Sequence, residues 1–525
     1  MKKIFNYMFA GLLGCAALSG CADDALETTP TDSMSGTGLL ANANSALVPL
    51  NGIYRSMYSS WSPTGNTHQS FGISSYNIMA DVMGDDMIMD AMGSSWYWYD
   101  AMYDVKSFYT SGAWRSYDMW NCFYTWISNA NYILAAEETM GGSSEEVNYV
   151  IGQAYAIRAY SYFMLAQNFA RTYKGHETDA CCPIYTAPTV AGTQGNPRAT
   201  VQEVYDQIVA DMNRAIELLS NAPAQEHKTH IGLGVAYGLQ ARIALVMEDW
   251  ATARDAAHNA ISTSGCRVLP VTSFLGVNDA TAANVLWAAP IQSDQSGMYA
   301  SFFSHMDACD ELGSSAGAYG QSARKQINKE LYDNIMNPND ARKIWWDPTN
   351  AGSSRGAEAG YQQEKFKFAD RQTWTGDYIW MRVEEMYLIA AEAECRLGDE
   401  TAAKNDLTAV MSQRVEGYTT GKTGTALGAT SSDRTNSLLE EIIDQRRIEL
   451  WGEAGRIWDL RRLHQGFRRT AAQGWPTELL LTTRPTNDPE CYMWVLTIPQ
   501  SEFDGNVNMN PDTDQNPMGD YPGSN

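Results

Sequence analysis

The chain has 525 residues, enough for one to three domains with a large core, and a formal net charge of −24. This acidic balance argues against nucleic acid as a partner and against electrostatic attachment to anionic lipid, because both require a basic surface. The 16 tryptophans and 28 tyrosines outnumber the 14 phenylalanines. This excess favours half-exposed aromatic surfaces, because both side chains combine an apolar face with a polar atom.

Residues 1–20 have the pattern of a secretory leader. Lys2 and Lys3 precede a short apolar run, Met8–Leu18, which is too short to span a membrane. The run closes with Leu-Ser-Gly directly before Cys21, a pattern similar to the lipobox of bacterial lipoproteins. We therefore expect residues 1–20 to be a lipoprotein signal peptide and Cys21 to carry the lipid anchor. The alternative is an ordinary leader followed by a chance cysteine.

A flexible tether and then a helical body are predicted after the leader. Residues 21–45 are rich in Thr, Ser, Gly and Asp and have no hydrophobic period, which is typical of a tether. Residues 46–525 are predicted to form a single domain. Helical spacing of apolar residues begins at Ala46, and it recurs over Ser116–Thr139 and Val147–Thr172.

The stretch Trp61–Trp114 is the least regular part of the chain and the densest in aromatic residues. Its four consecutive aromatic residues at 96–99 cannot all point inward from a helix or a strand. Flat aromatic faces can stack on sugar rings, while nearby carboxylates such as Asp85 and Asp86 accept hydrogen bonds from hydroxyl groups. The pattern therefore favours a sugar-binding site. The alternative is a hydrophobic plug packed beneath an irregular loop.

A second irregular stretch extends over Val268–Gly320. It contains a short apolar segment with β character, Asn284–Ile291, followed by a Ser- and Gly-rich loop that carries Tyr299 and Phe302. Long loops in compact domains are often functional. These two aromatic residues are therefore a second candidate for ligand binding.

Two helical hairpins of the tetratricopeptide (TPR) kind are predicted. In Tyr378–Arg414, apolar residues recur at steps of three and four until Gly398-Asp399 interrupts them, which predicts two antiparallel helices. The same pattern recurs in Val235–Ile261 when Asp249 is aligned with Asp399. Self-similar hairpins indicate TPR-like units within one domain. The alternative is a pair of unrelated alanine-rich hairpins.

Two further helices have clear signals. Thr200 is predicted to cap a helix and to form a capping box with Glu203. A later helix, Leu438–Arg462, carries arginines interleaved with acidic residues. We interpret these as ion pairs that hold the final helices together, rather than as a basic patch.

The sequence predicts no enzymatic activity. It lacks the GxSxG, HExxH and phosphate-loop motifs. Paired carboxylates such as Glu384-Glu385 point about 100° apart on a helix. A glycosidase, which remains an alternative, needs two carboxyl groups facing each other across a cleft.

Metals and disulfides have weak sequence support. His227 and His230 have helical spacing but no third ligand nearby, so no metal site is predicted. Asp512, Asp514 and Asn516 alternate like part of a calcium loop without its glycine and final glutamate, so calcium stays a minor alternative to having no cofactor. The seven cysteines after the lipobox have irregular spacing, which leaves one or two disulfides open.

Several segments together resemble the SusD/RagB family of nutrient-binding outer-membrane lipoproteins of Bacteroidetes. They occur in the expected order over nearly the whole chain: the lipobox at Cys21, the helix Arg158–Phe163, the turn Gly398-Asp399, the block Arg446–Arg461 and the tail Ile498–Pro517. The tail departs from the family's Gln-Asn-Pro-Gly-Tyr pattern, because Met518 and Asp520 interrupt it.

The resemblance implies a mostly α fold, in which TPR-like helical hairpins form an α-superhelical scaffold with minor β structure. The helices are expected at about 116–262 and 378–462, and an irregular, loop-rich ligand-binding side at about 61–114 and 268–375. The implied ligand-binding residues are Asp85, Asp86, Trp96, Tyr97, Trp98 and Tyr99, with Tyr299 and Phe302 added by loop placement.

The resemblance also implies a function without catalysis. Such a lipoprotein is displayed on the outer face of the outer membrane, captures a glycan and delivers it to a partner, a SusC-like TonB-dependent transporter. The same architecture binding peptide, as in RagB-like proteins, is the main alternative. A TPR scaffold without a nutrient ligand is another.

Overall fold

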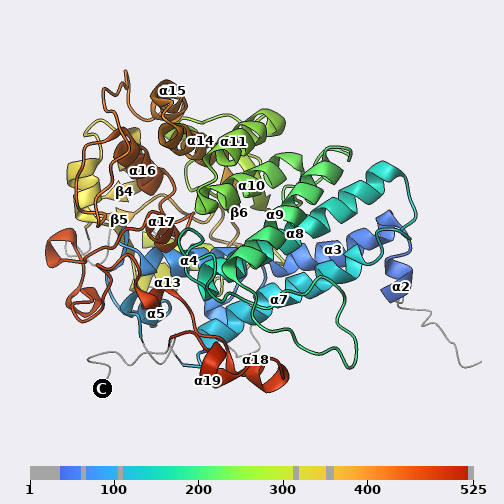
Figure 1. Ribbon diagram of the computed structural model, residues 1–525. Helices are drawn as coiled ribbons and strands as arrows, with labels where there is room; N and C mark the ends of the chain where they lie inside the picture. The colour runs from blue at the N-terminus through green and yellow to red at the C-terminus, as the bar shows by residue number, and fades with distance from the viewer. Residues whose placement is uncertain (1–35, 61–66, 105–109, 311–317, 350–359, 518–525) are drawn as a thin grey trace, which may run out of the picture.

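The computed structural model describes residues 36–60, 67–104, 110–310, 318–349 and 360–517. Over these residues the chain is mostly α-helical with short strands, as predicted (Figure 1). The helices of the first half are α2 Gly36–Leu39, α3 Ala43–Ser56, α4 Ile73–Met83, α5 Trp98–Met102, α7 Trp114–Leu134, α8 Ser144–Phe169, α9 Val201–Leu219, α10 Leu233–Met247 and α11 Trp250–Ser264.

The second half adds shorter helices and most of the strands. Its helices are α12 Phe302–Met306, α13 Tyr319–Ser322, α14 Val383–Leu397, α15 Glu400–Met411, α16 Leu438–Glu449, α17 Arg456–Arg462, α18 Gln500–Gly505 and α19 Pro511–Asp514. The strands of the whole chain are β1 Met87–Met89, β2 Val285–Ala289, β3 Lys325–Ile327, β4 Trp346–Asp347, β5 Gln362–Gln363 and β6 Tyr378–Arg382.

The long helices form a stacked scaffold. Helices α7, α8, α9, α10, α11, α14 and α15 each pack against the next in the series, and α16 packs on α14. Figure 1 shows this row running from α7 through the green helices α9 to α11 and on to α14 and α15. Such nearest-neighbour stacking is the arrangement of helical repeats. The predicted α-superhelical scaffold is therefore confirmed.

The two predicted hairpins share the same turn chemistry. Asp249 and Asp399 each cap the second helix of a hairpin, because their side chains accept hydrogen bonds from the backbone amides of Thr252 and Ala402. The first helix of each hairpin ends at a residue in the left-handed conformation, which is Glu248 in one hairpin and Gly398 in the other. Glycine adopts this conformation without a steric cost, and the turn reverses the chain there.

Two predicted helix boundaries are wrong. The first residues of Tyr378–Arg414 form strand β6, which pairs antiparallel with β2, because long-range pairing overrides the local helical spacing. The predicted helix Leu438–Arg462 breaks into α16 and α17. Gly452 and Gly455 lie between them at φ values of 80° and 72°, a left-handed conformation that ends a helix.

The start of the chain also differs from the prediction. Asn42 caps α3, so helical structure begins within the segment predicted as a tether. The irregular stretch Trp61–Trp114 contains helix α4, which has no amphipathic signal because almost all of its residues are buried. By contrast, the capping box of Thr200 and Glu203 at the start of α9 is confirmed.

A four-stranded antiparallel sheet lies beside the scaffold. Its strand order is β1-β3-β5-β4, and it joins the region after α4 to the segments at 325–327 and 346–363. A separate two-stranded sheet joins β2 to β6. These pairings bring the two predicted loop-rich stretches together on one side of the molecule.

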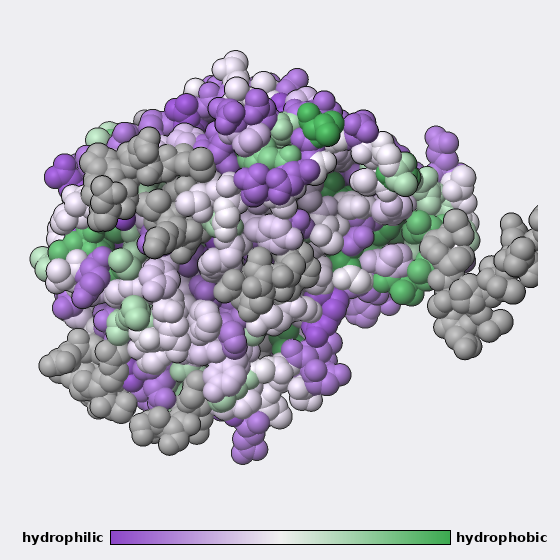
Figure 2. All heavy atoms as spheres, turned by 90° about the horizontal axis from the view of Figure 1, so that it is seen from below, coloured by the Kyte–Doolittle hydropathy of each residue, from purple (hydrophilic) through white to green (hydrophobic). Residues whose placement is uncertain are grey.

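The surface on the side of α18 and α19 is mostly polar. Figure 2 shows hydrophilic and intermediate residues over most of this face, with hydrophobic residues in small groups. Within the described residues, no helix combines the length and the apolar character needed to cross a membrane. The leader and Cys21 lie outside these residues, so the lipid anchor stays a prediction.

Candidate functional site

Four aromatic rings from separate segments form an aromatic cluster: His68, Trp96, Tyr299 and Tyr319. The rings of His68 and Trp96 are stacked, with centroids 5.0 Å apart and an interplanar angle of 18°. Tyr319 lies within 5.9 Å of both these rings and of Tyr299, and its hydroxyl is 2.8 Å from His68 Nδ1. All four side chains are half-buried or exposed. The cluster therefore lies at the surface and is partly open to solvent.

A buried arginine aligns two segments of the cluster. Arg115 on α7 is fully buried, and it donates to Asp100 of α5 at 2.9 Å and to the carbonyl of Gln69 at 2.9 Å. The Gln69 side chain also accepts a hydrogen bond from the amide of Tyr97 at 2.7 Å. These bonds hold the residues next to His68 and Trp96 in register, because a bidentate guanidinium fixes the orientation of its partners.

The backbone around Trp96 and Tyr299 adopts an uncommon conformation. Ser95, Tyr97 and Ala300 have φ values of 68°, 62° and 51°. Residues with a Cβ rarely adopt positive φ, and when the surrounding packing enforces it, the position is often part of a functional site. The packing thus fixes the backbone conformation of the two loops that carry Trp96 and Tyr299.

The four consecutive aromatic residues divide between surface and core. Trp96 is half-buried and Tyr99 is 42% exposed, whereas Tyr97 and Trp98 are 0% and 5% exposed. The Tyr97 ring packs edge-on against the buried His305. The predicted mixture of exposed and enclosed rings is therefore present, but Tyr97 and Trp98 belong to the core.

The second candidate pair divides in the same way. Tyr299 is 44% exposed and belongs to the aromatic cluster. Phe302 is buried and packs against Phe303, Phe366 and Tyr378. Trp96 and Tyr299, which lie 203 positions apart in the chain, are thus brought together, while Phe302 supports the loop from beneath.

The structure places Asp85 and Asp86 away from the surface. Both are 3% exposed. Arg456 Nε lies 2.8 Å from an oxygen of Asp85, and Arg447 Nη2 lies 2.6 Å from an oxygen of Asp86. Burial opposes ionisation of Asp85, but the two arginines outweigh it and hold its pKa below the usual range. These carboxylates join α16 and α17 to the end of α4, and they do not reach a ligand at the aromatic cluster.

A cavity adjoins the aromatic cluster and shares Tyr299 with it. Its volume is about 330 Å³. Its aromatic lining consists of Tyr58, Tyr299, Phe303, Phe368, Trp374 and Tyr378. Its polar lining consists of Arg55, Ser59, Ser60, Gln295, Ser296 and Ser301. Six aromatic and six polar side chains thus line the cavity, and flat rings combined with polar groups suit a small-molecule site.

Arg55 is the cation of this cavity. Its guanidinium carbon lies 4.7 Å from the centroid of the Tyr58 ring, and its Nη1 is buried without a hydrogen-bond partner among the described residues. An unused buried donor costs free energy unless a ligand or water satisfies it. Arg55 is therefore the charged group of the lining, and one of its donors is used by no described residue.

A second cavity lies in the scaffold and has a different character. Its volume is about 60 Å³, which leaves room for a few water molecules. Arg242, Glu385, Arg446, Asp459 and Arg462 are among its lining residues. Its ion-paired walls and small size make it a structural feature rather than a nutrient site.

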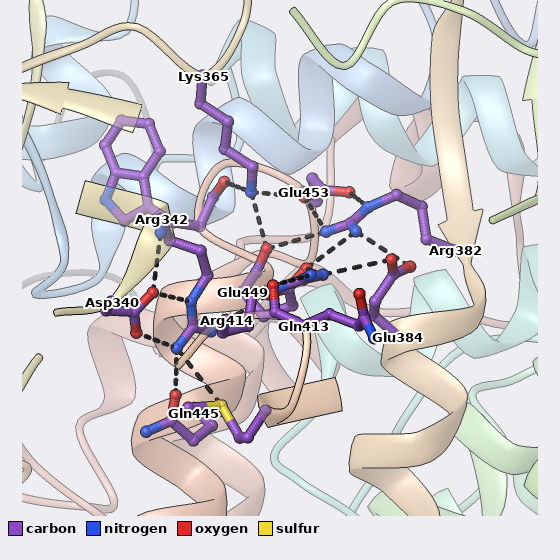
Figure 3. Close-up of polar contacts among 12 residues, drawn as sticks. Asp340, Arg342, Lys365, Arg382, Glu384, Gln413, Arg414, Gln445, Glu449 and Glu453 are labelled. Atoms are coloured by element: carbon purple, nitrogen blue, oxygen red, sulfur yellow. Dashed lines mark hydrogen bonds and ion pairs between the residues drawn. The ribbon is translucent and has the colours of Figure 1, made fainter. Parts of the chain in front are cut away.

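The predicted ion pairs within the final helices are confirmed at Asp459, whose carboxylate contacts Arg446 and Arg462 at 2.8 and 2.6 Å. Glu449 pairs instead with arginines from outside this block. Glu449 on α16 is fully buried, and its carboxylate contacts the guanidinium groups of Arg342, Arg382 and Arg414 at 2.8 to 3.2 Å (Figure 3). Arg382 and Arg414 also contact Glu384 at 3.1 and 3.4 Å. Glu384 and Glu449 are thus held against arginines inside the core.

The other polar motifs have structural partners. Both ring nitrogens of His230 are used, by the Tyr149 hydroxyl at 2.8 Å and Asn51 Oδ1 at 2.7 Å. Asn516 donates to the carbonyls of Phe169 and Leu496. Of these partners, Tyr149, Phe169 and Leu496 are buried. The seven cysteines at 122, 181, 182, 266, 309, 395 and 491 are free thiols.

Sequence reasoning missed several residues of this site. His68, Tyr319 and Trp374 lie singly in irregular segments, where no period marks them, and Arg55 lies in the last turn of α3. For His68, Tyr319 and Trp374 the only available signal was their position in the predicted loop-rich stretches, and Arg55 had no signal. Their proximity depends on contacts between segments far apart in the chain.

Comparisons with known families match most of the chain. Residues 67–245 match a family model described as "Starch-binding associating with outer membrane", and residues 307–519 match the model of the SusD family. The chain belongs to the SusD/RagB family. A comparison with curated proteins finds no match.

Solved structures of SusD proteins share the fold. A SusD-like carbohydrate binding protein from Bacteroides vulgatus has a TM-score of 0.73 at 23% identity, covering 90% of this chain and 98% of its own. A SusD superfamily protein from Bacteroides thetaiotaomicron has a TM-score of 0.71 at 22% identity, with 91% and 100% covered. Surface glycan-binding protein A from Bacteroides thetaiotaomicron, solved with laminarihexaose, has a TM-score of 0.64 at 18% identity, with 90% and 98% covered.

Proposed function

We propose that this SusD/RagB protein is a non-catalytic, cell-surface lipoprotein of the outer membrane that binds glycan and delivers it to a SusC-like TonB-dependent transporter. The observation that carries the proposal is the aromatic cluster with its adjoining cavity. Trp96 is half-buried and Tyr299 is 44% exposed, and Arg55 lines the cavity that shares Tyr299 with the cluster. One of the structural neighbours, a surface glycan-binding protein, was solved with an oligosaccharide.

The chemistry of the site suits a sugar chain. A pyranose ring presents C–H groups on its faces and hydroxyl groups around its edge. Aromatic faces attract the C–H groups, and polar groups such as Arg55, Gln295 and Ser296 fix the hydroxyls. Because the cluster is open to solvent and the cavity adjoins it, a chain can lie across the rings while one residue enters the cavity.

The proposal of a non-catalytic role rests on the state of the carboxylates. Retaining and inverting glycosidases need two carboxyl groups about 5 to 9 Å apart across the bound sugar. The paired acids Asp85-Asp86 and Glu384-Glu385 are instead buried against arginines. The cavity lining named above contains Arg55 but no Asp or Glu.

Affinity electrophoresis tests the proposal. The purified protein migrates through native gels that contain a single polysaccharide, such as starch, laminarin or xylan. We expect one of them to retard the wild-type protein, and Trp96→Ala and Tyr299→Ala to restore free migration. Tyr132→Ala is the matched control, because Tyr132 has the same 44% exposure as Tyr299 but lies on α7, outside the cluster.

The outcomes separate the alternatives. Retardation that Tyr132→Ala removes and Trp96→Ala leaves intact would place the site elsewhere. If no glycan retards the protein, calorimetry with short oligosaccharides and with peptides follows. Binding of peptides without binding of any glycan would show that the ligand is a peptide.

A further inference from the structure

Three metal-ligating side chains meet where the two TPR-like hairpins pack together. His258 lies on α11, Glu394 on α14 and Asp406 on α15, and one donor atom of each lies within 4.8 Å of the other two. His258 Nε2 is 2.7 Å from Asp406 Oδ2 and 3.7 Å from Glu394 Oε1. The cluster lies outside the aromatic cluster and its cavity, and the proposed function does not use it.

One oxygen of this cluster is unsatisfied. Glu394 is 4% exposed, and its Oε2 is buried and accepts no hydrogen bond from any described residue. A buried carboxylate oxygen without a donor is costly. A bound cation would remove this cost and offset the repulsion between the two carboxylates.

We propose that His258, Glu394 and Asp406 bind one zinc ion, which links the two hairpins. An imidazole nitrogen with two carboxylate oxygens is a donor set that suits zinc, whereas calcium prefers oxygen ligands alone. Bonds of about 2.0 Å at tetrahedral angles place neighbouring donors about 3.3 Å apart. The two separations from His258, 2.7 and 3.7 Å, lie on either side of this value, and all three donor atoms lie within 4.8 Å of one another.

The surroundings of the cluster give a zinc ion access from solvent and allow a water molecule as its fourth ligand. The His258 side chain is 43% exposed, so water reaches the cluster from the surface of α11. Arg254, on the same helix, is engaged with Asp255 at 2.7 Å. Three protein ligands and one water make a four-coordinate zinc site, and the ion joins α11 of one hairpin to α14 and α15 of the other.

The test uses the purified full chain after dialysis against a chelator. Zinc chloride is titrated by calorimetry, and thermal unfolding is followed with and without zinc. We expect one zinc per chain and a higher Tm with zinc, because an ion that binds only the folded state stabilises it. His258→Gln and Asp406→Asn should each weaken binding at least tenfold. Calcium chloride should produce no comparable rise in Tm.

The Glu394→Gln variant tests whether Glu394 binds zinc or only stabilises the fold. The substitution removes the charge of a buried carboxylate that repels Asp406, so it should raise the Tm of the zinc-free protein while abolishing the response to zinc. His227→Gln is the matched control, because His227 is a surface histidine beside the carboxylate of Glu226 and should leave zinc binding intact.

Three results would overturn the proposal. One is the absence of zinc binding to the wild-type chain. Another is a zinc response that survives in Glu394→Gln and Asp406→Asn. The third is a response lost in His176→Gln or His464→Gln, since these histidines share Glu490 and form a different group.

Discussion

The aromatic cluster and the ion-paired network around Glu449 both gather side chains that often carry function, yet their settings are opposite. The cluster is built from loops and short helices, its backbone includes positive φ angles at Ser95, Tyr97 and Ala300, and its rings reach solvent. The network joins β6, α14 and α16 with neighbouring segments, and the side chains of Arg342 and Glu449 are completely buried (Figure 3).

This contrast distinguishes binding from support. A ligand gains free energy when it covers exposed rings or accepts a hydrogen bond from a donor that no described residue uses. Arginines and carboxylates that already pair with one another make no such contribution to binding, and they hold the scaffold in a single arrangement. The charged residues of the final helices therefore stabilise the fold, and the half-exposed aromatic residues are the candidates for recognition.

The largest effect is expected at the centre of the network. Glu449→Gln removes the charge that three buried arginines share, and it should lower the free energy of unfolding by about 3–5 kcal/mol. Denaturant unfolding measures this loss. Glu217→Gln is the control, because its pair with Arg214 is exposed and should contribute less than about 1 kcal/mol. Equal losses in the two variants would contradict the structural role of the network.

The two tryptophans of the 96–99 segment should behave differently. Trp98→Ala empties a core position that is 5% exposed, so it should cost about 3–5 kcal/mol of stability. Trp96→Ala should cost less than about 2 kcal/mol of stability, while weakening glycan binding by about 2 kcal/mol, or thirtyfold. Thermal unfolding and calorimetry on the same samples check both. A Trp96→Ala variant that unfolds as readily as Trp98→Ala would favour the plug interpretation.

The network should also make stability depend on pH. Burial opposes ionisation of Glu449, but Arg414, Arg382 and Arg342 outweigh it and hold its pKa well below the usual range. The unfolded chain then binds a proton more readily than the folded one. The contribution is complete above the unfolded pKa of about 4.3, and it is lost at about 1.4 kcal/mol per pH unit as the pH falls from there towards the folded pKa. Unfolding from pH 7 to pH 3 should show this slope in wild type, and a shallower one in Glu449→Gln.

The smallest effect is expected at Arg55. Arg55→Gln shortens the charged side chain of the cavity lining, so it should weaken glycan binding by about 1 to 1.5 kcal/mol, roughly five- to tenfold. Stability should change little, because the buried Nη1 makes no hydrogen bond to any described residue. Calorimetry measures the affinity. Unchanged affinity together with a lower Tm would show that Arg55 only supports α3 and Tyr58.

Much of the scaffold was predictable because its signals are local. The spacing of apolar residues located α10, α11, α14 and α15, and Thr200 with Glu203 located the start of α9. These patterns follow from the helical period and from the need to satisfy the first amide groups of a helix. Local patterns failed where distant partners decided the outcome, as in β6, whose partner strand β2 lies about 90 residues earlier.

The sequence by itself determined the helical class, the repeated hairpins, the family resemblance and the abundance of aromatic residues near position 96. Only the tertiary structure decided which rings face solvent, that Asp85 and Asp86 are enclosed by arginines, and that His258 meets Glu394 and Asp406. The physical reason is that helix formation depends on neighbours within a few positions, whereas burial and pairing depend on residues that only the folded chain brings together.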